Sequence, residues 1–132
     1  MKKELQEKLI KDFPTLFADR DKSPRETCMC YGCDCASGWE PIIREACEKL
    51  TALNEPKLKF TQVKEKFGSL RLYTSLHNEE IGKIVRDAEN KSCETCEECR
   101  TTDNVTTKGP GWILTLCEKC RKERFEKRNK NI

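Results

Sequence analysis

Two pairs of cysteines carry the strongest chemical signal in the sequence. Cys96 and Cys99 form one C-x₂-C pair, and Cys117 and Cys120 form a second pair after the segment 100–116. Two such pairs at a separation of about 15–20 residues are typical of a zinc ribbon. Each pair turns tightly enough to direct two thiolates at one ion, at a Zn–S distance of about 2.3 Å. The spacing therefore predicts one Zn²⁺ held by these four cysteines.

The predicted site is structural and not catalytic, because four thiolates leave no coordination position for water or substrate. Zinc suits four soft sulfur ligands, and iron is its usual competitor. Unbound or disulfide-bonded cysteines are the alternative. Cys93 extends the first pair to C-x₂-C-x₂-C, the opening of a bacterial iron–sulfur pattern, but Asp103 stands where that pattern needs its next cysteine. Cys93 is thus a spare thiol, a ligand of a second site or an alternative partner in the first pair.

A second cysteine cluster lies near the N-terminus. A two-residue turn at Tyr31 and Gly32 would form a hairpin whose four sulfurs share one face. Such an arrangement could hold a second zinc, so we expect one Zn²⁺ site, or two if this cluster also binds metal. Core cysteines ahead of Trp39 and a pair of cross-strand disulfides are the open alternatives. The candidate ligands are Cys28, Cys30, Cys33 and Cys35.

The composition explains why a metal would be needed. The chain has 132 residues, of which 36% are hydrophobic and 37% are charged, and it contains 10 cysteines. So little apolar area for a single compact domain usually requires additional cross-links. The N-terminal segment lacks the apolar stretch of a secretory signal, and no apolar run approaches the length of a membrane span. We therefore expect a cytoplasmic protein, whose reduced thiols bind metal.

The periodicity of apolar residues predicts an α+β fold. Residues 1–13 and 39–53 have helical spacing, and Ser37 with Glu40 has the spacing of a capping box. Residues 57–75 are typical of two strands joined at Gly68-Ser69, and Asn78 is placed to cap a further helix.

These predicted elements divide the chain into two parts. We expect a helical and β-hairpin core over 1–92 that carries the N-terminal cysteine cluster, and a zinc ribbon with a charged C-terminal helix over 93–132. In the predicted fold, a small antiparallel sheet packs against helices and the ribbon follows it. Cys47 falls on the apolar stripe of the second helix and is expected in the core. His77, the only histidine, is expected at a helix start without a chemical role.

Three stretches resemble small proteins of tailed phages and prophages. These are Gly32-x-x-Cys35-x-x-Gly38-Trp39, the segment 62–73 (QVKEKFGSLRLY), and the ribbon with its segment 111–120 (GWILTLCEKC). Such relatives often have glycine where this chain has Ala36 and Arg100. The resemblance implies a virus-derived protein that acts in the cytoplasm of a bacterial host cell, and it brings no catalytic residue with it.

The central strands carry the candidate ligand-binding residues. Segment 57–73 contains five Lys or Arg against the single acid Glu65, and aromatic side chains are interleaved with them. A basic surface with aromatic groups is typical of proteins that bind nucleic acid. The alternative is a solvated strand face with the aromatic rings inside. A second basic stretch covers 117–132, but three glutamates within it reduce its net positive charge. The candidates are Lys64, Lys66, Arg71 and Tyr73.

Three functions are compatible with these patterns. The first is a non-catalytic zinc protein that binds a phosphate-bearing ligand, either nucleic acid or a nucleotide signal, in the interplay of phage and host. The second is a protein-directed inhibitor of a host defence enzyme. The third is a thiol-dependent redox enzyme, which would need an exposed thiolate of low pKa. No catalytic triad, phosphate loop or paired carboxylates are evident, so we expect a binding protein and not an enzyme.

Overall fold

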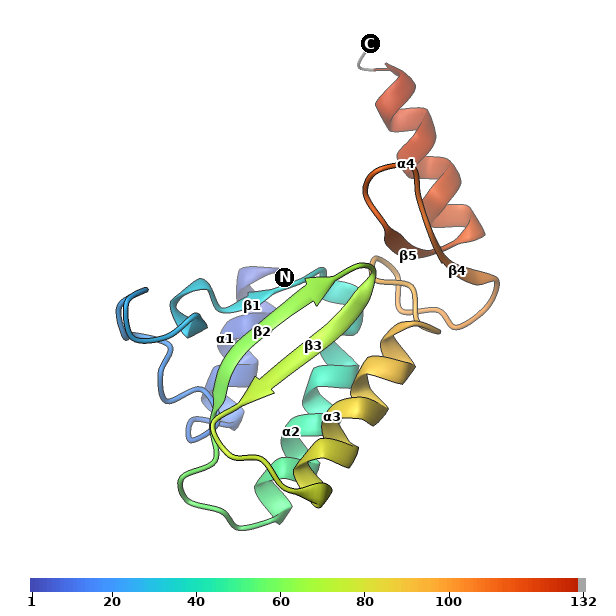
Figure 1. Ribbon diagram of the computed structural model, residues 1–132. Coiled ribbons are helices and arrows are strands. Elements are labelled where there is room, and N and C mark those ends of the chain that lie inside the picture. The colour runs from blue at the N-terminus through green and yellow to red at the C-terminus, as the bar shows by residue number, and fades with distance from the viewer. Residues whose placement is uncertain (131–132) are drawn as a thin grey trace.

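The protein has an α+β fold in which a three-stranded sheet with helices precedes a two-stranded ribbon (Figure 1). The structure, a computed structural model, describes the backbone of residues 1–130 and the side chains of residues 1–128. The helices and strands are α1 (Lys3–Asp12), β1 (Cys33–Asp34), α2 (Glu40–Ala52), β2 (Phe60–Lys66), β3 (Ser69–Thr74), α3 (Glu79–Ser92), β4 (Val105–Lys108), β5 (Leu114–Cys117) and α4 (Glu118–Lys130). Short 3₁₀ turns at Met29–Tyr31 and Ser37–Trp39 flank β1.

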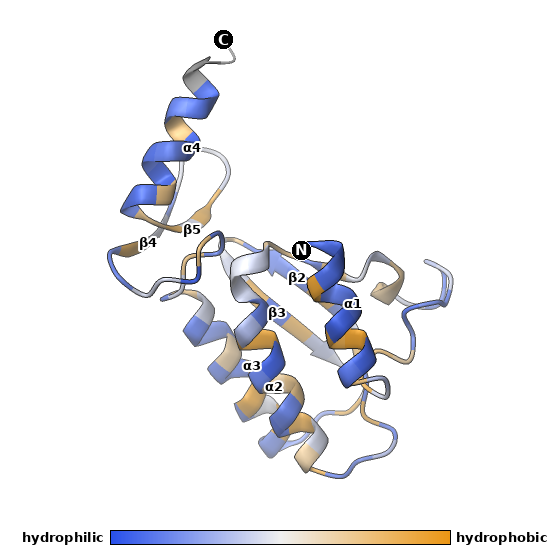
Figure 2. Cartoon of the chain, turned by 180° about the vertical axis from the view of Figure 1, so that it is seen from behind, coloured by the Kyte–Doolittle hydropathy of each residue, from blue (hydrophilic) through white to orange (hydrophobic). Residues whose placement is uncertain are grey.

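One face of the three-stranded sheet is covered by helices. The antiparallel strands β2 and β3 place Val63 opposite Leu72, and both side chains are buried. Helices α1, α2 and α3 lie on that side of the sheet, as the two opposite views show (Figures 1 and 2). Within residues 1–130, no helix covers the other face of β2 and β3 (Figures 1 and 2). β1 joins the sheet in parallel beside β2, with Cys33 opposite Val63, so the sheet is mixed rather than purely antiparallel.

The predicted helices form with the expected ends. α1 ends just before Pro14, whose ring disfavours a helical residue ahead of it. α2 begins at Glu40 with Pro41 in its first turn, and Cys47 is buried on its inner stripe as expected. Asn78 caps α3, because its side-chain Oδ1 accepts a hydrogen bond from the Ile81 N–H at 2.8 Å.

Two local predictions are wrong. Ser37 does not form a capping box with Glu40, because it lies in the 3₁₀ turn and its Oγ accepts from the Lys2 N–H at 2.8 Å. The β2–β3 turn is at Phe67 and Gly68, one residue earlier than predicted. Both residues have positive φ, 54° and 83°, which suits the two-residue hairpin turn that matches strand twist.

Two separate cores hold the molecule together. The larger core includes the fully buried Trp39, Ile43, Leu50 and Phe60. The ribbon has its own small core, in which the buried members are Cys96, Leu116 and Cys117. So few apolar side chains do not stabilise a fold alone. The ribbon therefore needs a cross-link in addition to its apolar core.

Helix α4 extends away from the sheet and its helices (Figure 1). It follows β5 directly and is almost entirely hydrophilic (Figure 2). Within the described residues, no helix has the length and apolar character that a membrane span requires.

Candidate metal centre

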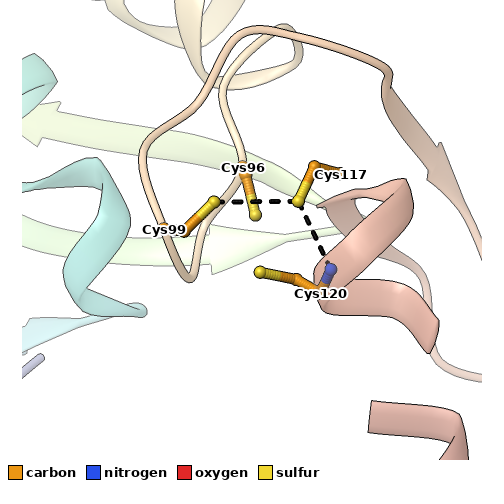
Figure 3. Close-up of side chains that lie close together, drawn as sticks. All are labelled: Cys96, Cys99, Cys117 and Cys120. Carbon is orange, nitrogen blue, oxygen red and sulfur yellow. Dashed lines mark hydrogen bonds between the residues drawn. The ribbon is translucent and has the colours of Figure 1, made fainter. Parts of the chain in front are cut away.

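The four cysteines of the ribbon converge on one point. One sulfur atom from each of Cys96, Cys99, Cys117 and Cys120 lies within 4.8 Å of the other three, so the group could hold a metal ion (Figure 3). A tetrahedral ion with bonds of about 2.3 Å requires sulfurs about 3.8 Å apart. The Sγ atoms of Cys99 and Cys117 are 3.7 Å apart. The geometry is that of a closed four-thiolate site.

The first cysteine pair is shaped by a tight loop that follows α3. The Cys96 N–H donates to the Thr101 carbonyl at 2.8 Å, and the Arg100 N–H donates to the Cys96 carbonyl at 3.0 Å. Arg100 closes this loop with φ of 73°, in the left-handed region that glycine adopts most easily. Glycine at position 100 would adopt this φ without the steric cost of a Cβ.

The second pair uses the junction of a strand and a helix. Cys117 is the last residue of β5, and Cys120 lies in the first turn of α4. The Cys120 N–H donates to the Cys117 Sγ at 3.4 Å and lowers the pKa of Cys117 to about 7. Unpaired N–H groups at a helix N-terminus favour negative charge, so this position stabilises a thiolate.

Burial and the neighbouring sulfurs both raise the pKa of Cys120. The same sulfurs lower the pKa of Cys117, so one thiolate in the group forms readily and then opposes the ionisation of Cys120 when no cation lies between them. A divalent cation reverses this effect, because each thiolate then gains more from the ion than it loses to its neighbours. The donor set thus fits a thiophilic dication.

The ribbon is attached to the large core through the residues on either side of Cys96. The Glu97 carbonyl accepts from the Gly38 N–H at 2.7 Å, and the Trp39 Nε1–H donates to the Thr95 carbonyl at 3.0 Å. A Cβ on Gly38 would lie 2.4 Å from the Cys96 carbonyl oxygen, so only glycine permits this approach.

A second attachment joins the ribbon to the β2–β3 turn. The hydroxyl of the fully buried Thr115 donates to the Gly68 carbonyl. The Thr115 N–H donates to the Glu97 carboxylate at 3.1 Å, whereas burial raises the pKa of Glu97. Contacts of Gly38, Gly68 and Thr115 therefore bring the segments 32–39, 62–73 and 111–120 together at this junction.

The four N-terminal cysteines do not converge as a group. Cys33 lies in the core and burial raises its pKa to about 12, whereas Cys28 is exposed. No hairpin forms at Tyr31, because the chain makes a 3₁₀ turn there and Gly32 leads directly into β1. Among the side chains that the structure describes, only the ribbon cysteines form a convergent group of three or more metal-binding residues. The predicted hairpin, in which all four sulfurs share one face, is therefore wrong.

The remaining sequence candidates lie apart from the metal centre. Cys93 is exposed and outside the four-sulfur group. His77 is one of the residues that line a cleft between β3 and α3.

The four candidate ligand-binding residues share the open face of the sheet. By strand alternation Lys64, Lys66, Arg71 and Tyr73 all lie on the side away from the helices, and Lys64 pairs in register with Arg71. The charge of this face is partly balanced, because Arg71 forms an ion pair with the Glu89 carboxylate, with Nε and Oε1 2.9 Å apart. Their role as ligand contacts remains a prediction.

No family model, curated protein or solved structure matches the chain.

Proposed function

We propose that the chain is a non-catalytic zinc protein of phage or prophage origin that binds a phosphate-bearing ligand in the bacterial cytoplasm. The observation that carries this proposal is the closed group of four cysteines. A site with no open coordination position stabilises a fold and activates no water. The function therefore belongs to the surfaces that the metal holds in place. Among cations that suit four thiolates, zinc fits the ribbon spacing best.

The surface charge supports a phosphate-bearing ligand. The segments 57–73 and 117–132 each carry a formal charge of +4, since they contain five Lys or Arg against one acid and seven against three. A surface with concentrated positive charge attracts anions and accelerates their association. Nucleic acid and small nucleotide signals are both ligands of this kind. In a phage protein, such binding would serve to counter a host defence.

Native mass spectrometry of protein purified from bacterial cells tests this proposal. We expect one zinc per chain together with a retained nucleotide or oligonucleotide, identified after acid release. A labelled nucleotide or oligonucleotide should then bind the purified protein, with an affinity that falls steeply as salt increases. Stoichiometric copurification of a host protein, together with salt-insensitive or absent binding of both phosphate probes, would refute the proposal and favour the inhibitor alternative.

A further inference from the structure

A groove between the β4–β5 hairpin and α4 has a volume of about 800 Å³. We call it the ribbon groove, and it is considerably larger than the cleft of about 290 Å³ between β3 and α3. Its charged and aromatic lining includes Lys108, Trp112, Arg121, Arg124, Phe125 and Arg128. Among the residues that the structure describes, no carboxylate lines it.

The charges of α4 are segregated around the helix axis. Arg121, Arg124, Phe125 and Arg128 are spaced by three or four residues, so they follow one face, and this face lines the groove. The three glutamates of α4, at positions 118, 123 and 126, do not line it. A count of charges along the sequence therefore understates how basic this surface is.

Two aromatic side chains are exposed at the same groove. Trp112 is 70% exposed and Phe125 is 65% exposed, although most large apolar side chains of the chain are buried. The rings come from the hairpin loop and from α4 respectively, so they flank the groove from two elements. An aromatic ring that stacks on an unpaired base improves affinity by about 5- to 150-fold per base, for any base.

The cations of the groove have no strong anionic partners among the described side chains. Arg121 is anchored by bonds to the carbonyls of Thr106, Lys108 and Leu114, at 2.6, 3.1 and 3.0 Å. These acceptors are uncharged, and the buried Nε of Arg121 has no hydrogen-bond partner within the described part of the chain. Arg124 approaches Glu98 at 3.6 Å, but both side chains are about half exposed and such a pair is readily exchanged for another anion.

We propose that the ribbon groove binds single-stranded nucleic acid. Its cations contact successive phosphates, and Trp112 and Phe125 stack on unpaired bases. A duplex is disfavoured, because its bases already stack on one another and expose no face to a side chain. This inference rests on the proposed phosphate-bearing ligand, and it names both the ligand and its site.

The direct test is fluorescence anisotropy of a labelled 15-nucleotide oligo(dT), with the zinc-loaded full chain. Lys108, Arg124, Lys127 and Arg128 line the groove and are available for phosphates. Four such contacts predict a slope of log K against log salt of about −3. The tryptophan emission should be quenched as well. Because Trp39 is fully buried, Trp112 is the ring that a ligand can reach.

Matched variants locate the site. The double variant Arg124→Glu with Arg128→Glu should bind oligo(dT) at least tenfold more weakly, and Trp112→Ala should lose at least fivefold. The control Lys119→Glu with Lys122→Glu makes the same charge change away from the groove, and its affinity should stay within about threefold of the unmodified chain. Zinc content and circular dichroism verify that every variant is folded.

The outcomes separate this inference from the proposed function. If Lys64→Glu with Arg71→Glu abolishes oligo(dT) binding and the groove variants do not, the ribbon groove is not the site and the proposed function stands. If a small nucleotide binds tightly and oligo(dT) does not bind, the inference about the ribbon groove fails and the proposed function again stands. Binding to phosphatidylserine vesicles but not to oligo(dT) would overturn the inference in favour of a membrane surface. If no phosphate-bearing probe binds, both proposals fail.

Discussion

Replacement of Gly38 by alanine should detach the ribbon from the large core. The added Cβ would lie 2.4 Å from the carbonyl oxygen of Cys96 and 2.4 Å from the carbonyl carbon and oxygen of Glu97. All three are backbone atoms next to the metal centre, so they cannot move aside as the end of a long side chain does. The two segments must separate, and the hydrogen bonds that join them, from the Gly38 N–H and the Trp39 Nε1–H, weaken together.

The expected loss of stability is about 3 kcal/mol. Overpacking of a well-packed site costs about 1–3 kcal/mol, and each weakened hydrogen bond adds about 1 kcal/mol or less. For a chain of this size, a loss of about 3 kcal/mol lowers Tm by roughly 10 °C. The metal ligands are untouched by the substitution, so the metal content should remain that of the unmodified protein.

Thermal unfolding followed by circular dichroism, with the metal-loaded protein, measures this change. Gly82→Ala is the matched control, because a Cβ there meets only the mobile end of Arg86, with Nη1 at 3.0 Å. Alanine inside α3 should instead stabilise the protein by about 0.5–1 kcal/mol. An unchanged Tm for Gly38→Ala would refute the argument that this close approach holds the ribbon in place.

Three further predictions concern the cysteines and the loop at the metal centre. Cys99→Ser should abolish stoichiometric metal binding, whereas Cys93→Ser should retain it. Elemental analysis measures the metal content of both variants, and equal metal contents would contradict the assignment of the four ligands. Arg100→Gly should raise the free energy of unfolding by about 1 kcal/mol, because it relieves a positive φ of 73°; a destabilised variant in urea denaturation would contradict this. Iodoacetamide should label the exposed Cys28 and Cys93 before the buried Cys33, because burial raises the thiol pKa of Cys33 to about 12 and leaves little thiolate at pH 8; mass mapping that finds Cys33 labelled as fast as Cys28 would contradict the burial of Cys33.

Features fixed by local spacing could be predicted from the sequence. The two C-x₂-C pairs specify the ribbon because each pair makes its own turn, and α3 follows Asn78 because the cap and the apolar stripe are neighbours in the chain. The shared face of Lys64 and Arg71 likewise follows from strand alternation. In each case the relevant contacts join residues that are close in sequence or lie in adjacent strands.

Features that depend on distant contacts could not be predicted. Four cysteines within eight positions allowed a hairpin, but pairing with Val63 draws Cys33 into the core instead. The role of Gly38 depends on Glu97, which lies far along the chain. The ribbon groove likewise requires a hairpin and a helix to be placed side by side, so the glutamates of α4 obscured its charge in the sequence.

The metal content of the purified protein tests the central claim most directly. Elemental analysis and intact native mass, measured without added metal at neutral pH, should give one zinc per chain. Acid should release it as the thiolates are protonated. A well-folded protein that contains no metal, or whose ribbon cysteines have the mass of disulfides, would contradict the account.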